Sequence, residues 1–178
     1  MAILSDHLGP LHHYVQIFSL VLFWSWGDTG AAQTTAPGTY NVDISATPLS
    51  PNELEINMHL DLPPGSFTYS PLTCDPLLGH VRLELQENPH LTLGADSAYR
   101  ESPASIAEMD PVLNQWVRVI RQPVIVSRTY QLSAPGEAFK TTGGVFFVLE
   151  PACTPIDIQF ILAGNKAGDF EVQKLTSR

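Results

Sequence analysis

The two cysteines are the residues of this sequence best suited to chemistry, because a thiol can form a disulfide or react as a nucleophile. Cys74 lies in "YSPLTCDP", and Cys153 lies in "FFVLEPACTPIDIQF". Both positions are expected in loops between strands. If the fold brings these loops together, a Cys74–Cys153 disulfide would close a loop of roughly eighty residues and stabilise the fold by about 4 kcal/mol in the chain-entropy model. The alternative is that both thiols stay reduced and are buried as small apolar side chains.

Histidines and carboxylates indicate no second chemical site. His59, His80 and His90 form no HxH or HxxxH pair, so they are expected at the surface and not as metal ligands. The sequence contains no GxSxG, Gly-rich phosphate loop or CxxC motif. The carboxylates are scattered and nominate no acid/base pair. We therefore expect no metal and no cofactor.

The charge balance excludes one class of partner. Nine Lys and Arg residues against eighteen Asp and Glu residues give a formal net charge of −9. A nucleic-acid interface needs clustered basic residues, so nucleic acid is not expected as a partner. The length of 178 residues suits one domain, and fifteen prolines and twelve glycines interrupt the chain too often for long helices.

The amino-terminal segment is expected to direct export. Residues 14–26, "YVQIFSLVLFWSW", are mostly apolar, and small residues follow them. This pattern predicts a signal peptide over residues 1–32, cleaved near Ala31 or Ala32, and a linker over residues 33–40. No Lys or Arg precedes the apolar run, so the signal is atypical. The alternatives are an uncleaved membrane anchor and a buried helix. Export would place both cysteines in an oxidising compartment.

The elements that must position the cysteines show the period of strands. Apolar residues alternate in "TYNVDISATPL", "ELEINMHLDL" and "GHVRLELQ", and strand-forming residues dominate "WVRVIRQPVIVSRTYQL", "GGVFFVLE" and "IDIQFIL". We predict an all-β, immunoglobulin-like sandwich of seven to nine strands over residues 41–164. Residues 89–116 are less regular, with a helix-compatible patch from Ile106 to Met109. Residues 165–178 form a tail or a short edge strand.

The order of landmarks resembles the amino-terminal domain of the thiol:disulfide interchange protein DsbD. The matching elements are "GSFTYS", "SPASIAEMDPVLNQWVRVI" and the closing hairpin "GGVFFVLEPACTPIDIQF". The resemblance covers roughly residues 41–163, and each motif is moderately specific. It implies a periplasmic sandwich that exchanges disulfides through two cysteines in the closing hairpin, beneath a cap loop with an acidic and aromatic lining.

The resemblance also implies partners and site residues. The partners would be a membrane thiol reductase and periplasmic thioredoxin-like proteins. Cys153 matches the second hairpin cysteine, whereas Glu150 or a neighbour stands where the first would lie. By position, Asp110 matches the cap-loop region, and Phe67 and Tyr69 match the aromatic residues beneath it. The missing cysteine leaves Cys74 as the candidate resolving thiol.

Three functional hypotheses follow. The first is an exported thiol-redox domain that uses Cys153 and Cys74, and its enzymatic turnover stays open. The second is a non-enzymatic sandwich that binds another envelope protein and is stabilised by a structural disulfide. The third is a surface module anchored by residues 14–26. Because Glu150 and Asp157 would raise the pKa of a nearby Cys153, and the nearest cation in sequence is Lys140, we expect disulfide exchange no faster than that of a simple thiol.

Overall fold

The computed structural model describes residues 39–73, 79–94 and 96–175, which form an antiparallel β-sandwich without a helix. They lie within one compact unit, Ala36–Arg178. The predicted signal peptide and nearly all of the predicted linker fall outside the described residues. The strands of the described part are β1 (Asn41–Ser50), β2 (Glu53–Asp61), β3 (Thr68–Tyr69), β4 (Arg82–Leu85), β5 (Leu91–Leu93), β6 (Arg100–Ser102), β7 (Ile106–Asp110), β8 (Gln115–Ile120), β9 (Val124–Leu132), β10 (Phe139–Leu149), β11 (Thr154–Gly164) and β12 (Phe170–Lys174).

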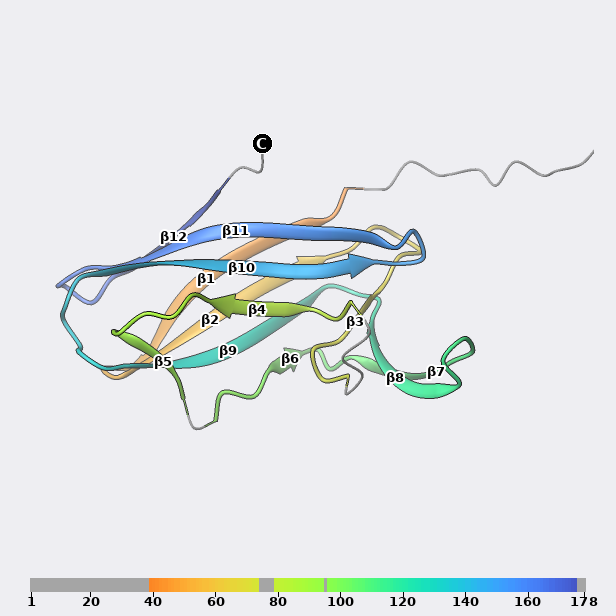
Figure 1. The fold of residues 1–178 in the computed structure, drawn as a ribbon, viewed down its shortest axis with the longest axis horizontal. Coiled ribbons are helices and arrows are strands. Elements are labelled where there is room, and N and C mark those ends of the chain that lie inside the picture. The colour runs from red at the N-terminus through yellow and green to blue at the C-terminus, as the bar shows by residue number, and fades with distance from the viewer. Residues whose placement is uncertain (1–38, 74–78, 95, 176–178) are drawn as a thin grey trace, which may run out of the picture. The chain divides into compact units, whose positions relative to one another are not determined.

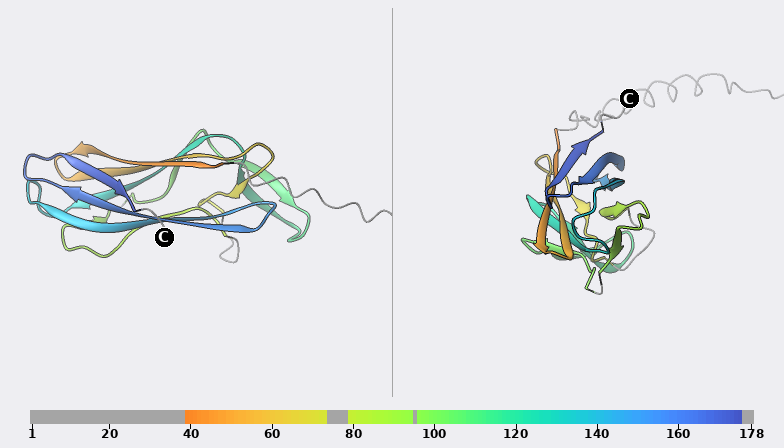
Figure 2. Two further views of the ribbon diagram at one scale, coloured as in Figure 1. Left: turned by 90° about the horizontal axis from the view of Figure 1, so that it is seen from above. Right: turned by 90° about the vertical axis from the view of Figure 1, so that its left-hand side faces the viewer.

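These strands form three sheets. The first has the order β1-β2-β9-β5, with β6 also paired to β9, and the second has the order β12-β11-β10-β4. These two sheets are the layers of the sandwich (Figures 1 and 2). The third sheet, β3-β8-β7, lies at the end of the sandwich where the β10–β11 hairpin turns (Figure 1). The predicted all-β sandwich is confirmed.

The core follows from the period-two pattern of the long strands. In β2, Leu54, Ile56, Met58 and Leu60 are fully buried, while the residues between them face outward. Side chains from β10 and β11 meet them from the other sheet, and Phe147 is fully buried among them. Successive side chains of a strand point to opposite faces, so the alternation in sequence becomes one apolar face per sheet.

A glycine in β10 makes room for an aromatic ring of this core. A Cβ atom on Gly143 would lie 2.2 Å from Cζ of Phe160, which is fully buried. The next residue, Gly144, points to the opposite face, where a Cβ would lie 3.2 Å from Nε2 of the exposed Gln159. The two adjacent glycines therefore face different neighbours, and of the two only Gly143 is required by packing of the core.

The irregular middle of the sequence forms strands, not a helix. The patch from Ile106 to Met109 belongs to β7, which pairs with β8 from Ile106↔Val119 to Asp110↔Gln115. The helix-compatible interpretation was wrong. Apolar residues of this hairpin remain exposed, so its sequence lacks the alternation of apolar and polar residues that marks a strand with one buried face. The count of seven to nine strands was too low because β3, β5 and β6 have only two or three residues each.

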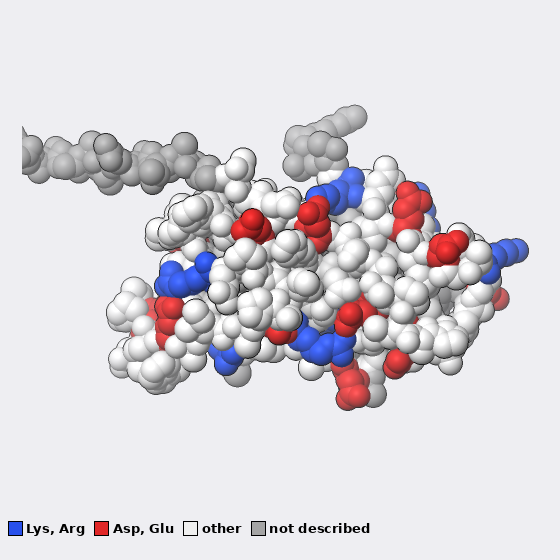
Figure 3. Space-filling model, turned by 180° about the vertical axis from the view of Figure 1, so that it is seen from behind, with Lys and Arg blue, Asp and Glu red and all other residues white. Residues whose placement is uncertain are grey.

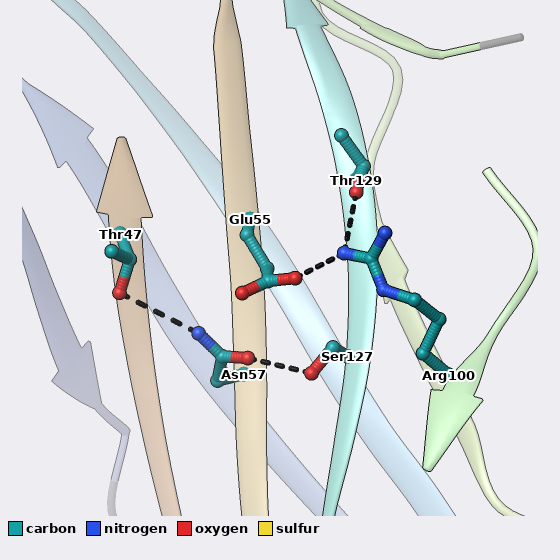
Figure 4. A network of polar contacts seen from close by, with 6 residues as sticks. All are labelled: Thr47, Glu55, Asn57, Arg100, Ser127 and Thr129. Carbon is teal, nitrogen blue, oxygen red and sulfur yellow. Dashed lines mark hydrogen bonds and ion pairs between the residues drawn. The ribbon is translucent and has the colours of Figure 1, made fainter. Parts of the chain in front are cut away.

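Polar side chains join four strands on the outer face of the first sheet (Figure 4). Ser127 Oγ donates to Asn57 Oδ1 at 2.6 Å, and Asn57 Nδ2 donates to Thr47 Oγ1 at 3.5 Å. Arg100 of β6 forms an ion pair with Glu55 and donates from Nη2 to an outward-facing threonine of β9 at 3.0 Å. The contacts of Arg100 anchor the short strand β6 to the sheet.

Within the part of the chain that the structure describes, no helix could cross a membrane. The apolar run at residues 14–26 lies outside that part.

Candidate functional site

Cys153 lies in the turn between β10 and β11. The two strands pair from Phe139↔Gly164 to Leu149↔Thr154, so residues 150–153 form the turn. Cys153 is exposed, and its φ of 50° lies in the left-handed region. This conformation costs about 1–2 kcal/mol for most residues other than glycine. The turn therefore holds a cysteine where the backbone would favour glycine.

The Cys153 thiol is free in the structure. Cys74, its predicted disulfide partner, lies outside the described residues, so the predicted bond stays a prediction. The reading of Cys153 as a small buried side chain is wrong, because the residue is exposed at a turn. Its Sγ donates a hydrogen bond to Glu150 Oε2 at 3.2 Å. This hydrogen bond, and next the negative charge of Glu150, raise the pKa of the Cys153 thiol.

The predicted effect of Glu150 on Cys153 is thus present, whereas Asp157 is not among the causes of the shift. A thiol with a raised pKa carries little thiolate at neutral pH, and the thiolate is the nucleophile. The site presents an accessible but weakly activated thiol.

Glu150 attaches the turn to Phe67, the residue before β3. The Phe67 amide donates to the Glu150 carbonyl oxygen at 3.1 Å, and the Glu150 amide donates to the Phe67 carbonyl oxygen at 2.8 Å. The Phe67 ring meets the Tyr69 ring edge to face, with centroids 5.8 Å apart. Phe67 and Tyr69, both predicted from the sequence as site residues, therefore lie beside the thiol turn.

Tyr69 connects this turn to the β7–β8 hairpin. The hydroxyl of the buried residue Tyr69 donates to Asp110 Oδ2 at 2.9 Å. Burial first, and then this hydrogen bond, raise the pKa of Tyr69 to about 12; the negative charges of Asp110, Glu150 and Cys153 add to the shift. The structure thus brings together five of the residues predicted from the sequence. We refer to Cys153, Glu150, Phe67, Tyr69 and Asp110 as the Cys153 cluster.

Asp110 also fixes the turn that follows β7. Its Oδ1 accepts hydrogen bonds from the amides of Val112 at 2.8 Å and Leu113 at 3.0 Å. The Leu113 amide first, and the Tyr69 hydroxyl next, lower the pKa of Asp110. An aspartate side chain that bonds backbone amides two and three residues ahead stabilises a turn. Asp110 therefore holds the tip of the β7–β8 hairpin in place.

That hairpin carries a concentration of exposed apolar side chains. Met109 and Trp116 lie opposite each other across the two strands, and Trp116 is 69% exposed. The full set on the hairpin is Ile106, Met109, Val112, Leu113 and Trp116. Clustered exposed apolar residues are typical of surfaces that bind another molecule.

Two arginines of this end were missed by the sequence analysis. The Arg121 guanidinium stacks on the Phe67 ring, 4.3 Å from its centroid, and forms an ion pair with Glu108 at 2.8 Å. Arg118 exchanges hydrogen bonds with Thr73: its amide donates to Thr73 Oγ1 at 3.1 Å, and Thr73 Oγ1 donates to its carbonyl at 3.0 Å. The sequence signal was two basic residues within and directly after an apolar strand, but most of their partners come from segments distant in the sequence.

Two further features of the described residues concern possible metal sites and the distribution of surface charge. They contain no group of three His, Cys, Asp or Glu side chains that could hold a metal ion. On the face that Figure 3 shows, acidic and basic side chains are interspersed and form no basic patch. The chemistry that this end of the sandwich can offer is that of one thiol and its acidic and aromatic neighbours.

No protein-family model and no curated protein matches the chain. A solved structure of the complex between the DsbD amino-terminal and PilB amino-terminal domains from Neisseria meningitidis is similar at 11% identity and a TM-score of 0.42. The match covers 68% of this chain and 80% of the other. The GAE domain of GGA2p from Saccharomyces cerevisiae is similar at 10% identity and a TM-score of 0.33, covering 78% of this chain and 91% of the other. With both TM-scores below 0.5, neither structure identifies a fold family or a function for this chain.

Proposed function

We propose that this chain is a thiol-exchange domain of the DsbD amino-terminal type, which docks a thioredoxin-like protein and reacts with it through Cys153. One observation carries the proposal: the Cys153 thiol is exposed on a turn that backbone hydrogen bonds to Phe67 fix in place, within the cluster of Glu150, Phe67, Tyr69 and Asp110. The motif order over residues 41–163 supports the same assignment.

The exchange step is a substitution at sulfur. The Cys153 thiolate attacks one sulfur of the partner's disulfide, a mixed disulfide forms, and the partner's second sulfur leaves as a thiolate that takes up a proton. Glu150 accepts the hydrogen bond of the resting thiol and is the nearest group to receive its proton. No net oxidation occurs, because one disulfide replaces another.

The raised pKa of Cys153 limits the rate of this step. At neutral pH most of the thiol is protonated, because Glu150 favours the neutral form. We therefore expect the reaction with a small disulfide to be no faster than that of a simple thiol. A rate advantage would come from docking, which raises the local concentration of the two sulfurs.

A surface suited to docking lies at the same end of the sandwich as the thiol (Figure 1). The exposed apolar residues of the β7–β8 hairpin lie on the same element as Asp110, which is bonded to Tyr69 of the cluster. Apolar side chains at the centre of an interface supply much of the affinity between proteins.

A second candidate is a binding module without exchange activity. The observation that favours it is Glu150 itself, which stands where the resemblance implies a cysteine and raises the pKa of Cys153. In this reading the partner docks on the same end of the sandwich, and no mixed disulfide forms.

The test is release of thionitrobenzoate. A thioredoxin-fold protein with one cysteine of its CxxC pair replaced is loaded with thionitrobenzoate on the other and mixed with the reduced chain. Each mixed disulfide releases one coloured thiolate. The Cys74→Ser variant keeps Cys153 as the single thiol, and the Cys74→Ser/Cys153→Ser variant is the control. The free reagent, 5,5′-dithiobis(2-nitrobenzoate), measures the reactivity of Cys153 without docking.

We expect stoichiometric release from the loaded protein at a higher rate than from the free reagent, and no release with the double variant. Binding of the loaded protein without release would favour the binding module. Neither binding nor release would overturn both candidates.

Export to the bacterial envelope or beyond is part of the proposal. It rests on the apolar run at residues 14–26 and the small residues that follow it. Amino-terminal sequencing of the secreted or periplasmic protein should give a first residue between Gly30 and Thr35. An intact Met1 in the membrane fraction would instead support an uncleaved anchor.

A further inference from the structure

The outer edge of β4 is covered by a side chain where a neighbouring strand could pair. β4 is the edge strand of the second sheet and pairs with β10 on its inner side, with Leu83 opposite Val145. On the outer side, the Leu83 amide donates to the Tyr99 hydroxyl at 3.1 Å, and this hydroxyl donates to the Leu83 carbonyl at 3.0 Å. One phenol thus satisfies both outward backbone groups of Leu83.

Arg128 holds this phenol in position. Its guanidinium carbon lies 4.7 Å from the centroid of the Tyr99 ring, and its Nη1 donates to the Leu83 carbonyl at 3.3 Å and to the Tyr99 hydroxyl at 3.4 Å. Arg128 Nε donates to the Ser97 carbonyl at 3.3 Å. Because Arg128 belongs to β9 of the opposite sheet, the contact also joins the two layers at this edge.

Exposed edge strands pair readily with other chains, and proteins commonly cover or charge them. The edge that Tyr99 covers has the pattern that self-pairing needs. A residue whose amide and carbonyl both point outward can form a hydrogen-bonded pair with its own copy across a two-fold axis. Leu83 is such a residue.

The charges beside Leu83 fit the same arrangement. In an antiparallel pairing with Leu83 opposite Leu83 of the second copy, Arg82 of each copy faces Glu84 of the other. Both side chains are exposed. Two opposite-charge pairs directly across from each other stabilise an antiparallel ladder. The pairing would be short, because the Val81 amide already donates to the Tyr69 carbonyl at 2.9 Å.

We propose that Tyr99 is a latch on a strand-addition edge, and that the partner this edge takes when the latch opens is β4 of a second copy of this chain. With the latch closed the chain is monomeric at this edge. With the latch open, the two four-stranded sheets join through Leu83, Arg82 and Glu84.

Removing one hydroxyl tests the latch. Tyr99→Phe keeps the ring and loses both hydrogen bonds to Leu83. We expect the variant to form a dimer in a concentration-dependent manner by light scattering, while the wild-type chain and the matched variant Tyr40→Phe stay monomeric. Under dilute conditions, hydrogen exchange at the Leu83 amide should become roughly tenfold faster, as expected for loss of a net hydrogen bond.

Charge reversal tests the register. In the Tyr99→Phe background, Arg82→Glu places two carboxylates opposite each other and should restore the monomer. Adding Glu84→Arg to that variant exchanges both charges and should restore the dimer. A Tyr99→Phe variant that stays monomeric at every concentration would overturn the proposal, and so would a dimer that ignores these charges.

A second measurement does not depend on the folding of Tyr99→Phe. Arg82→Cys and Glu84→Cys, each in a chain that lacks Cys74 and Cys153, are mixed in equal amounts under oxidising conditions. Transient opening of the latch should yield more mixed disulfide dimer than both like dimers together, because residue 82 faces residue 84 of the other copy. A mixed dimer only as abundant as the two like dimers together, which is the result of random pairing, would contradict the proposed pairing.

Discussion

Glu150 is the residue that sets the reactivity of Cys153. It accepts the thiol hydrogen bond at 3.2 Å and raises the pKa of the thiol. Glu150→Gln should therefore lower this pKa and increase the thiolate fraction at pH 7. We expect alkylation of Cys153 by iodoacetamide to become faster at pH 7, because the thiolate is the reacting form. The pH–rate profile of alkylation in a Cys74→Ser background measures it, and Asp157→Asn is the matched control. An unchanged profile would contradict the role of Glu150.

Asp110 makes the fold sensitive to acid. Backbone amides and the Tyr69 hydroxyl lower its pKa from the ordinary value of 3.8. A carboxyl group with a lowered folded-state pKa stabilises the fold above its unfolded-state pKa, and this stability is lost as pH falls through the folded-state pKa.

Asp110→Asn keeps the shape of the side chain and loses its charge. The variant should melt at a lower temperature than the wild type at pH 7, and the difference should shrink below about pH 4. Thermal unfolding between pH 7 and pH 2 measures both curves. A difference in melting temperature that stays constant to pH 2 would show that the charge of Asp110 does not contribute to the stability of the fold.

At the scale of the strand, β10 shows how a close contact constrains one residue and not its neighbour. Gly143→Ala would drive a Cβ atom into the fully buried Phe160 ring, whereas Gly144→Ala meets the end of the flexible Gln159 side chain. We expect Gly143→Ala to cost about 1–3 kcal/mol of unfolding free energy, as overpacking usually does. Gly144→Ala should change it by less than about 1 kcal/mol. Urea unfolding gives both values, and equal losses would contradict the packing argument.

The hairpin β7–β8 shows how an element can be ordered while exposing apolar residues. Its own small core consists of Val117 and Val119, packed with Tyr69 of β3 and with Phe67, the residue before this strand. Asp110 fixes its turn, and Arg121 of the loop that follows stacks on Phe67. The outward residues Met109 and Trp116 are therefore held in place before any partner binds, which reduces the entropy cost of docking.

At the scale of the whole molecule, the fold is expected to be independent of the amino-terminal segment. Every residue of the main buried core lies between Val42 and Leu162. A chain that begins at Ala36 should unfold in a single cooperative transition, with the same midpoint as the chain that begins at Met1. Circular dichroism and near-ultraviolet fluorescence should report the same midpoint. A lower midpoint for the shorter chain would show that residues 1–35 contribute to its stability.

The sequence by itself determined the class of the fold. Alternating apolar residues place Leu54, Ile56, Met58 and Leu60 on one face of β2, and the structure buries all four. This prediction works because the pleat of a strand relates residue i to residue i+2 through local geometry alone. The turn that carries Cys153 and the acidic neighbour that raises its pKa were also predicted from the sequence, since Glu150 is only three residues away.

Only the tertiary structure decided which distant residues meet. The bond from Tyr69 to Asp110 of the β7–β8 hairpin, the stacking of Arg121 on Phe67, and the closure of the β4 edge by Tyr99 all join segments far apart in the sequence. None of these contacts has a local period that a sequence could show. They depend on strand register and on the path of the loops, because a shift of one residue in register would move every contact to the opposite face.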